Sequence, residues 1–434
     1  MPAQPLTLER LVRAVEQDAA IRRIRVLQPT GGPGDKIFPP TYPGERDTEP
    51  PRHVFEHRRL KGDDVLCVLV DSVQSQANRL EESLGQLRQK APSLFPNVTV
   101  DFGETEVADL GSVSALEAPH RIYDAILRDS EIEGKPFRDS EDGKALALSK
   151  PQNATAVYKL APTALVFGAW NSTGEGGGLG AKFPRAVVSE IVGIGVATNG
   201  QQEPDGMRPG SRIDPLGIRS GVKVWKSPDG NWSFDAPPKT DAGKGEPKVP
   251  KAARGSASKD VKASKKKEAA EVKPSEINHS NIAPSLDPLG VSVDHLQHTL
   301  VVSMAALRRL HFPDEANGAR AADPYARAAL AALALTAALA QDRAGYFLRS
   351  RCDLVPAVNE PVGFRLVMSD GKEEEVDVTL EGAMKLVQAA AAAAAKAGVM
   401  WREKDVLLKP QKKLVDLILR SRELALRGVA EEGS

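Results

Sequence analysis

Apolar positions change their spacing along the first part of the chain, from a helical to a continuous pattern. Helical spacing predicts a helix over Leu6–Ala19, and Ile24–Leu27 has the pattern of a short strand. The run Asp64–Val70 is apolar after its first residue, which is typical of a buried central strand. It leads directly into a predicted helix whose N-cap is Asp71 or Ser72. The inner face of this helix is formed by the apolar residues Val73, Ala77, Leu80, Leu84 and Leu87.

Beyond this unit, the same patterns predict further helices and strands in mixed order. The expected helices are Ala118–Leu127, Thr155–Leu160, Ala321–Ala340 and Leu380–Ala397. The expected strands are Thr163–Phe167, from which a loop leads into Val187–Ala197, and the first part of Val291–Leu310, which continues as a helix. Phe364–Met368 and Glu375–Val378 are expected to pair as a hairpin, because Asp370-Gly371 is a turn signal. The sequence therefore predicts an α+β fold with long insertions.

Two segments interrupt these patterns. Prolines are so dense between Pro29 and Pro51 that helix and central strand are excluded, which leaves an extended arm or loop. Pro237–Lys273 carries ten lysines and one arginine against five acidic residues, with almost no large apolar residue. Such a segment buries too little surface to offset its chain entropy, so we expect a disordered or mobile insertion. The predicted organisation is a first core part over residues 1–236, this insertion over 237–273, and core completion with alanine-rich helices over 274–434.

Composition restricts the function classes. The 58 basic and 58 acidic residues cancel, so any nucleic-acid site must be a local patch. Cys67 and Cys352 have no CxxC spacing, which argues against a disulfide framework or a zinc finger. The N-terminus lacks the apolar core of a signal peptide. The longest apolar stretch, Ala328–Ala340, is shorter than the roughly 20 residues that span a bilayer. We expect a cytoplasmic protein with no membrane contact and no cofactor.

Two histidine pairs invite a metal interpretation. His53-Val54-Phe55-Glu56-His57 matches the HxxEH pattern of one zinc-protease group, whose chemistry needs both imidazoles on one helix face. Prolines stand just before it and a turn follows it, so an edge strand is the better interpretation. His295 and His298 are a second pair, without a nearby third ligand, and are interpreted as ordinary helix histidines. No metal site is predicted.

A glycine-rich loop, Gly174–Lys182, resembles phosphate-binding loops in composition only. It lacks the Walker pattern, because Phe183 follows Lys182, and it lacks GxGxxG because of Leu179. Glycines nevertheless let backbone amides approach phosphates closely, and Lys182 and Arg185 stand just beyond them. A phosphodiester backbone and a plain surface loop both remain open here.

Amide side chains gather at the start of the helix after the buried strand. Gln74, Gln76, Asn78 and Arg79 lie where free N–H groups and the helix dipole favour phosphate oxygens. The alternative is a solvated helix face. The loop SEINHSN, Ser275–Asn281, is a second polar segment, either a contact loop or a turn. No serine elbow, CxxC pair or carboxylate cluster predicts catalysis.

Five blocks stand in a fixed order along the chain: VLVDSVQSQANRLEESL, HRIYDAILRDS, TALVFGAWNSTGEGGGLGAKFPRAVVSEIVGI, KPSEINHSNIAPS and VVSMAALRRLHFP. Together they resemble the RAMP-type backbone subunit, a Cas-seven-like protein of the Csb family, in the type I-G (formerly I-U) CRISPR Cascade complex. The resemblance extends over about Gly34–Pro313. It implies an RRM-like (ferredoxin-like) core, elaborated into a hand shape with a thumb. Copies would oligomerise along the guide spacer and leave its bases free to pair with target DNA.

The resemblance also implies partners and contact positions. The partners are CRISPR RNA, further copies of the chain, the large subunit, a Cas-five/Cas-six-like subunit, and target DNA through the guide. Contacts would run through phosphates and sugars, since a guide differs in sequence at every spacer. The candidate RNA-binding residues are Gln74, Asn78, Arg79, Asn171, Ser172, Lys182, Arg185, Lys36, His279 and Asn281.

Other function classes compete with a scaffold that has no catalytic chemistry. A CRISPR-associated ribonuclease, acting on the guide precursor or on bound RNA, would use an acid such as Asp71 or Asp101. Asp71 is interpreted first as a helix cap. A metalloprotease would require zinc at His53 and His57.

Overall fold

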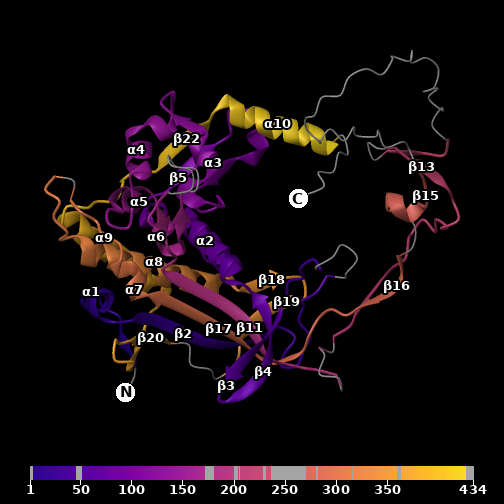
Figure 1. Ribbon diagram of the computed structural model, residues 1–434, viewed down its shortest axis with the longest axis horizontal. Coiled ribbons are helices and arrows are strands. Elements are labelled where there is room, and N and C mark those ends of the chain that lie inside the picture. Colours follow the sequence, from indigo (N-terminus) through magenta and orange to yellow (C-terminus); the bar gives the residue numbers. More distant parts are fainter. Residues whose placement is uncertain are drawn as a thin grey trace, which may run out of the picture. The chain divides into compact units, whose positions relative to one another are not determined.

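The chain divides into two compact units, the first formed by Met1–Met207 with Pro288–Asp416 and the second by Arg208–Asp287 with Leu417–Ser434. Figure 1 shows the computed structural model, in which elements are coloured along the sequence. The structure describes residues 3–44, 51–171, 180–199, 204, 206–227, 231–235, 270–279, 282–314, 316–358 and 363–426.

A ten-stranded sheet forms the base of the first unit and is antiparallel except for the short parallel pair at one edge. Its main order is β1 (Gln4–Pro5), β21 (Glu373–Asp377), β20 (Phe364–Val367), β2 (Ala20–Pro29), β17 (Val293–Ser303), β11 (Val187–Val196), β4 (Asp63–Asp71) and β3 (Phe55–Leu60). The hairpin of β18 (Tyr346–Arg349) and β19 (Cys352–Pro356) joins this sheet through β2.

One face of this sheet is buried and the other is partly exposed. Burial alternates along β2, where Arg23 is buried and Ile24 is exposed. Helices cover the buried face: Arg23 contacts Asp342 of α8, and Ser189 of β11 contacts Gln76 of α2. The sheet therefore has a covered side where polar groups meet helices and an open side.

The first unit contains helices of very different length (Figure 1). The longer ones are α1 (Leu8–Gln17), α2 (Val73–Lys90), α8 (Asp323–Ala344) and α9 (Leu380–Lys396). The shorter ones are α3 (Ala125–Arg128), α4 (Glu141–Ala147), α5 (Thr155–Leu160), α6 (Thr163–Phe167) and α7 (Met304–Arg308). Helix α8 packs against α1, α2, α6 and α9 and is buried along most of its length. Its many alanines allow this, because small side chains let neighbouring helices approach closely.

A second, five-stranded sheet lies in the first unit and brings distant parts of the chain together. Its order is β6 (Ser112–Ser114), β5 (Val98–Asp101), β22 (Val406–Pro410), β7 (Ser130–Ile132) and β8 (Lys135–Pro136). Single 3₁₀ turns at Pro92–Leu94, Ala108–Leu110, Arg121–Tyr123 and Phe137–Asp139 connect these elements.

The second unit is made of small strand pairs. β12 (Arg208–Arg212) pairs with β16 (Ile282–Asp287), and β13 (Val224–Lys226) lies between β14 (Trp232–Ser233) and β15 (Ala270–Val272). A 3₁₀ turn, η5 (Pro274–Ile277), follows β15. Helix α10 (Lys412–Leu426) begins in the first unit. Residues 237–269 of the predicted insertion lie outside the described residues, and residues 208–287 of the second unit span that insertion.

Most of the predicted elements are confirmed, and the fold is α+β as expected. The helix after the buried strand, both alanine-rich helices, the strand–helix pair after Val291 and the hairpin around Asp370-Gly371 are present. Ser72 caps α2 by accepting a hydrogen bond from the backbone N–H of Ser75. The strand predicted at Ile24–Leu27 is longer and becomes β2. The RRM-like description of the core stays a prediction.

Three predictions of local structure are wrong. Thr163–Phe167 is the helix α6, because its residues are buried on all sides and a short apolar run looks the same in helix and strand. Ala118–Leu127 is broken, since Asp124 caps a new helix by accepting from the backbone N–H of Ile126. Ala270–Val272, placed in the disordered insertion, is strand β15, held by its pairing with β13. No helix among the described residues is long and apolar enough to cross a membrane.

Candidate nucleic-acid interface

A two-residue hairpin stands where the glycine-rich loop leaves and rejoins the first unit. It pairs β9 (Ala169–Trp170) with β10 (Lys182–Phe183), so Trp170 and Lys182 are direct cross-strand partners. The Lys182 ammonium lies over the Trp170 ring, 4.4 Å from its centroid, in a cation–π contact. Trp170 is still 42% exposed. The hairpin thus presents an aromatic face together with a cation.

Two cavities share this hairpin. One, of about 410 Å³, is lined by Val73, Pro119, His120, Arg121, Phe167, Gly168, Ala169, Trp170, Phe183, Arg185 and Val188. The other, of about 740 Å³, is lined by Pro151, Gln152, Ala169, Trp170, Lys182, Phe183, Pro184, Arg309 and His311. Both have Trp170 in their wall, so a ligand that passes the hairpin can enter either cavity. Arg309 is exposed, and no ion-pair partner for it is present in the described part of the chain.

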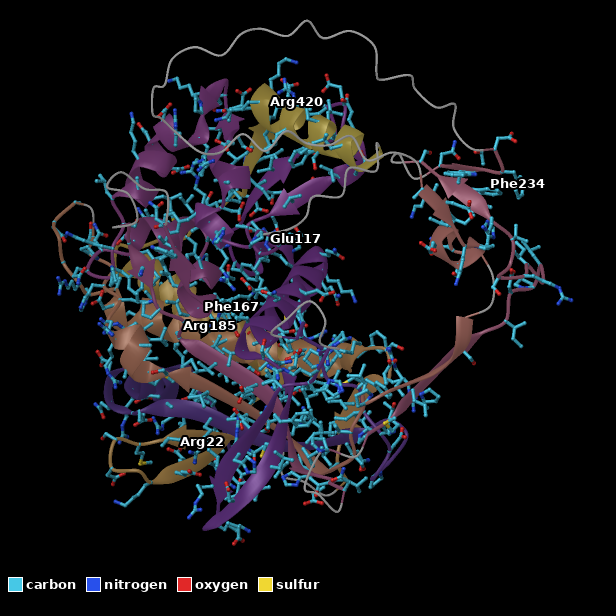
Figure 2. All side chains as sticks on the ribbon, turned by 45° about the vertical axis from the view of Figure 1, so that its right-hand side comes forward. Arg22, Glu117, Phe167, Arg185, Phe234 and Arg420 are labelled. Carbon is cyan, nitrogen blue, oxygen red and sulfur yellow. The ribbon has the colours of Figure 1, made fainter. Side chains whose placement is uncertain are left out.

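Two guanidinium groups line the smaller cavity, and one of them pairs with the buried carboxylate of Glu81. Arg121 forms a bidentate pair with Glu81, with both N–H···O distances at 2.6 Å, and also donates to the carbonyl of Gly168. Arg185 donates from Nε to the carbonyl of Phe167 at 3.1 Å, and Figure 2 shows the two residues side by side. No ion pair of Arg185 occurs among the described residues.

Of the two guanidinium groups at this cavity, only Arg121 forms an ion pair with a described residue. Burial raises the pKa of Glu81, and its bond to Arg121 offsets that effect only in part. Burial, followed by the like charge of Arg121, lowers the pKa of Arg185. Arginine nevertheless stays charged in proteins. A half-buried cation beside an already neutralised pair favours an anion, and phosphate is the anion that guanidinium recognises best.

The predicted residues of the loop region come together here. Lys182 and Arg185 line the cavities, and Asn171, which is partly exposed, follows Trp170. Ser172 lies outside the described residues. Gln74 and Asn78 are exposed on α2, and Gln74 follows Val73 of the cavity wall. These residues are thus in or next to one region of the first unit.

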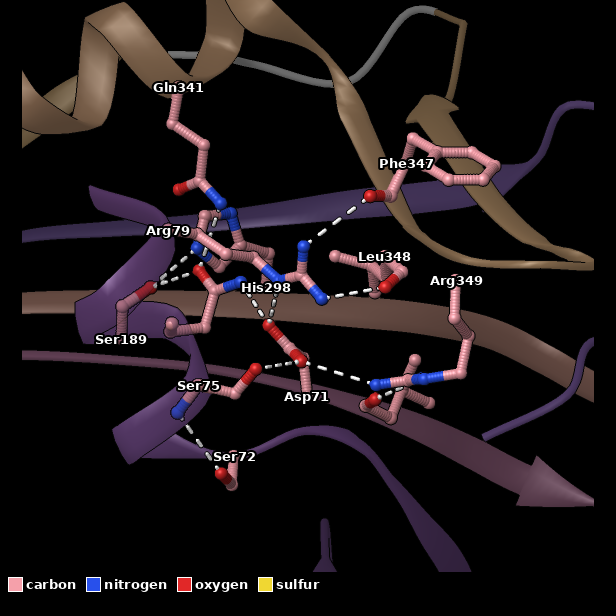
Figure 3. A network of polar contacts seen from close by, with 12 residues as sticks. Asp71, Ser72, Ser75, Arg79, Ser189, His298, Gln341, Phe347, Leu348 and Arg349 are labelled. Atoms are coloured by element: carbon pink, nitrogen blue, oxygen red, sulfur yellow. Dashed lines mark hydrogen bonds and ion pairs between the residues drawn. The ribbon is translucent and has the colours of Figure 1, made fainter. Parts of the chain in front are cut away.

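Arg79 points instead into a network of polar contacts (Figure 3). Its Nε donates to Asp71 at 2.9 Å, and its terminal nitrogens donate to the carbonyls of Phe347 and Leu348. The same guanidinium therefore anchors α2 to the β18–β19 hairpin.

Asp71 lies at the centre of this network and is fully buried. Besides Arg79, it accepts hydrogen bonds from Ser75, Gln76 and Arg349 at 2.7, 2.6 and 3.4 Å. With both oxygens engaged and no solvent contact, this carboxylate has no access to a scissile phosphate. Asp101, the other acid considered, accepts from the backbone N–H of Gly103 and the hydroxyl of Ser112.

The network continues toward α8 through a serine and a histidine. Ser189 donates to Gln76 at 2.9 Å and lies 2.7 Å from Nε2 of His298. Burial, followed by the charge of Arg23, lowers the pKa of His298 to about 3. Although Ser189 and His298 resemble a nucleophile and its base, both are buried, so no substrate can reach them. They serve to join the sheet to the helices.

The metal interpretations fail on geometry. His53 is buried, and its Nε2 accepts from the backbone N–H of Gly290 at 2.9 Å, while Nδ1 lies 3.1 Å from the carbonyl of Pro40. The motif enters β3, which is an edge strand as expected. His295 and His298 lie on strand β17 rather than on a helix, because the predicted strand extends through them, and they point to opposite faces. No group of three or more metal-binding side chains occurs in the part of the chain that the structure describes.

The remaining candidates lie elsewhere. Lys36 donates to the carbonyl of Met207 at 2.9 Å, which ties the proline-rich segment to the end of the first part of this unit. His279 belongs to the second unit, where it contacts Trp232. Asn281 lies outside the described residues.

Several residues of the cavities were missed by sequence reasoning. Trp170 stands inside the glycine-rich block, and a lone tryptophan followed by a run of polar and glycine residues is a signal for an exposed ring. Arg121, Arg309 and Gln152 gave no such signal, because long-range folding alone brings them to the hairpin.

One known family is similar to the part of the chain that contains the hairpin and most residues of the two cavities. Residues 22–198 match the family model described as CRISPR-associated protein GSU0053. This part of the chain is therefore similar to a CRISPR-associated protein family. The matched segment contains Trp170, Lys182, Arg185 and the Arg121–Glu81 pair. No curated protein matches the chain.

Proposed function

We propose that this protein is a CRISPR RNA-binding backbone subunit that oligomerises along the guide spacer in a type I-G Cascade complex for antiviral defence against DNA. The observation that carries the proposal is Arg185, a half-buried cation beside a neutralised ion pair in a cavity next to an exposed tryptophan. Support for the CRISPR context comes from the family match over residues 22–198.

The cavities suit a single-stranded, sequence-independent ligand. Arg185 supplies charge for a phosphate, and Trp170 supplies a ring on which any base can stack. Lys182 reinforces both functions, because it lies against the ring and carries a charge. A guide whose sequence changes from spacer to spacer requires this kind of contact.

We further propose that the chain acts without catalytic chemistry. Asp71 is saturated by donors, and Ser189 and His298 are enclosed. The other partners in this proposal are further copies of the chain, the large and Cas-five/Cas-six-like subunits, and target DNA through the guide. The complex would act in the cytoplasm.

The experiment is to co-express the full chain with a CRISPR array and its neighbouring complex genes, purify it, and sequence the RNA that co-elutes. We expect uniform guide-length RNA in a large ribonucleoprotein. Arg185→Gln should lower the RNA content per protein, whereas Arg59→Gln, on the exposed edge strand β3, should not. Protein that elutes free of RNA and monomeric from these cells would overturn the proposal.

A further inference from the structure

Aromatic side chains are exposed together on the second unit, which contains none of the residues that line the cavities at Arg185. Trp232 and Phe234 are 40% and 68% exposed. Their ring centroids lie 5.5 Å apart at 89°, and His279 meets Trp232 edge to face at 6.1 Å. Figure 2 shows Phe234 on this unit. Leaving such rings in water forfeits the free energy of burying them, so a ligand that covers them is favoured.

Strand pairing holds this cluster in place. Trp232 is the cross-strand partner of Lys226, which pairs on its other side with Ala270. Directly paired residues point to the same face of a sheet, so Trp232 and Lys226 lie together. The Lys226 ammonium donates to the carbonyl of Glu276 at 3.1 Å, which fixes it near the turn that carries His279. The result is an aromatic platform with a cation at its edge.

The chain around the platform favours a polyanion over an apolar protein partner. The segment 236–269 connects β14 to β15, the two outer strands of this sheet, and its sequence carries nine lysines and one arginine against four acidic residues. The platform therefore stands where a strongly basic stretch leaves and re-enters the fold. A ligand that offers both negative charge and stackable rings is single-stranded nucleic acid.

We propose that Trp232, Phe234 and His279, with Lys226, form a second binding site whose ligand is single-stranded nucleic acid held by base stacking. The site shares no residue with the cavities at Arg185, so it does not depend on the guide-binding proposal. Its contribution should be independent of sequence, because every base has a stacking face.

The test uses the full-length protein and a fluorescein-labelled 15-mer of deoxythymidine, with binding measured by fluorescence anisotropy. Stacking contributes about 1–3 kcal/mol per base, so Trp232→Ala should weaken binding about 5- to 150-fold. Trp232→Phe, which keeps a ring, should restore most of the affinity. Leu286→Ala is the matched control, since Leu286 is 68% exposed on β16 of the same unit, and it should leave the affinity unchanged.

A second probe separates stacking from a loss of folding or charge. A 15-mer of abasic phosphodiester has the same charge without bases, and it should bind wild type and Trp232→Ala equally. In the Arg185→Gln protein, Trp232→Ala should still cause its full loss, because sites that share no residue or partner add independently. Affinity for the thymidine probe that stays within two-fold in Trp232→Ala would overturn the proposal and leave a protein partner as the occupant. Equal losses for both probes would overturn it as well.

Discussion

Two polar regions of the first unit differ in how their charges are matched. Around Asp71, two arginines, a glutamine and a serine all donate to one buried carboxylate, so charge and hydrogen bonds are satisfied inside the protein. Around Glu81, Arg121 donates to both carboxylate oxygens. Arg185 donates to a backbone carbonyl and forms no ion pair with a described residue. The first arrangement stabilises the fold, whereas the second leaves a charge for a ligand.

The contrast shows why residue type alone is a poor guide to a binding site. Arg79 and Arg185 are both partly buried arginines near a sheet. Arg79 has a fully buried carboxylate as its partner, and Arg185 has a backbone carbonyl. Only the acceptor balance, which requires the three-dimensional structure, separates an anchor from a ligand-binding group.

The largest expected effect comes from removing the acceptor of the first region. Asp71→Ala leaves the donors of Gln76 and Arg79 without their partner, so we expect the free energy of unfolding to fall by about 3–5 kcal/mol. Denaturant unfolding measures this. Asp64→Ala, at an exposed position of the same strand, should cost far less. Similar losses in both variants would mean that the network around Asp71 does not stabilise the fold.

At Glu81 we expect a smaller loss of stability, together with tighter binding of RNA. Glu81→Gln removes the carboxylate that pairs with Arg121 and also attracts Arg185, so stability should fall by about 2 kcal/mol, the value of a hydrogen bond to a charged group. The same change should tighten the binding of single-stranded RNA, because a further positive charge becomes available. Anisotropy with a labelled 20-mer tests this, and weaker binding by the folded variant would contradict the proposed charge balance.

The buried network also predicts a pH dependence. The pKa of His298 is lowered to about 3, so its neutral form stabilises the fold fully above the unfolded pKa of about 6.5. Stability is then lost as pH falls from about 6.5 toward the pKa of His298 in the folded protein, by about 2 kcal/mol between pH 7 and pH 5. His298→Gln should flatten this slope, while His295→Gln, on the half-exposed side of β17, should retain it. A slope that His298→Gln leaves unchanged would exclude His298 as its source.

The exposed ring of Trp170 gives a further test of the region around Arg185. Trp170→Ala should weaken the binding of single-stranded RNA by about 1–3 kcal/mol, because one stacking contact is lost. Trp170→Phe should restore part of it. Phe347→Ala, at a 67% exposed ring of the first unit, is the control and should bind normally. Equal affinity in Trp170→Ala and wild type would show that bases do not stack at the hairpin.

The sequence predicted the frame of the fold better than its site. Long periodic elements such as α2 and α8 were predictable, since their inner faces repeat over several turns. The fully buried α6 was taken for a strand, because a five-residue apolar run has no period to read. At the site, Lys182 and Arg185 were predicted from their place beside the glycines. The neighbouring pair of Arg121 and Glu81, separated in sequence by 40 positions, meets through tertiary packing, which no local pattern encodes.

The most direct test of whether the Arg185 charge binds the guide is the salt dependence of RNA binding. For wild type, Arg185→Gln and Arg59→Gln, the affinity for a single-stranded RNA 20-mer would be measured across a range of salt concentrations, with unfolding followed in parallel. We predict that Arg185→Gln lowers the slope of log affinity against log salt by about 0.7, the value for one phosphate contact on a single strand. Its stability should stay the same or rise, because the repulsion with Arg121 is removed. An unchanged slope in Arg185→Gln, or a loss of stability without a loss of binding, would contradict the assignment of Arg185 to the guide.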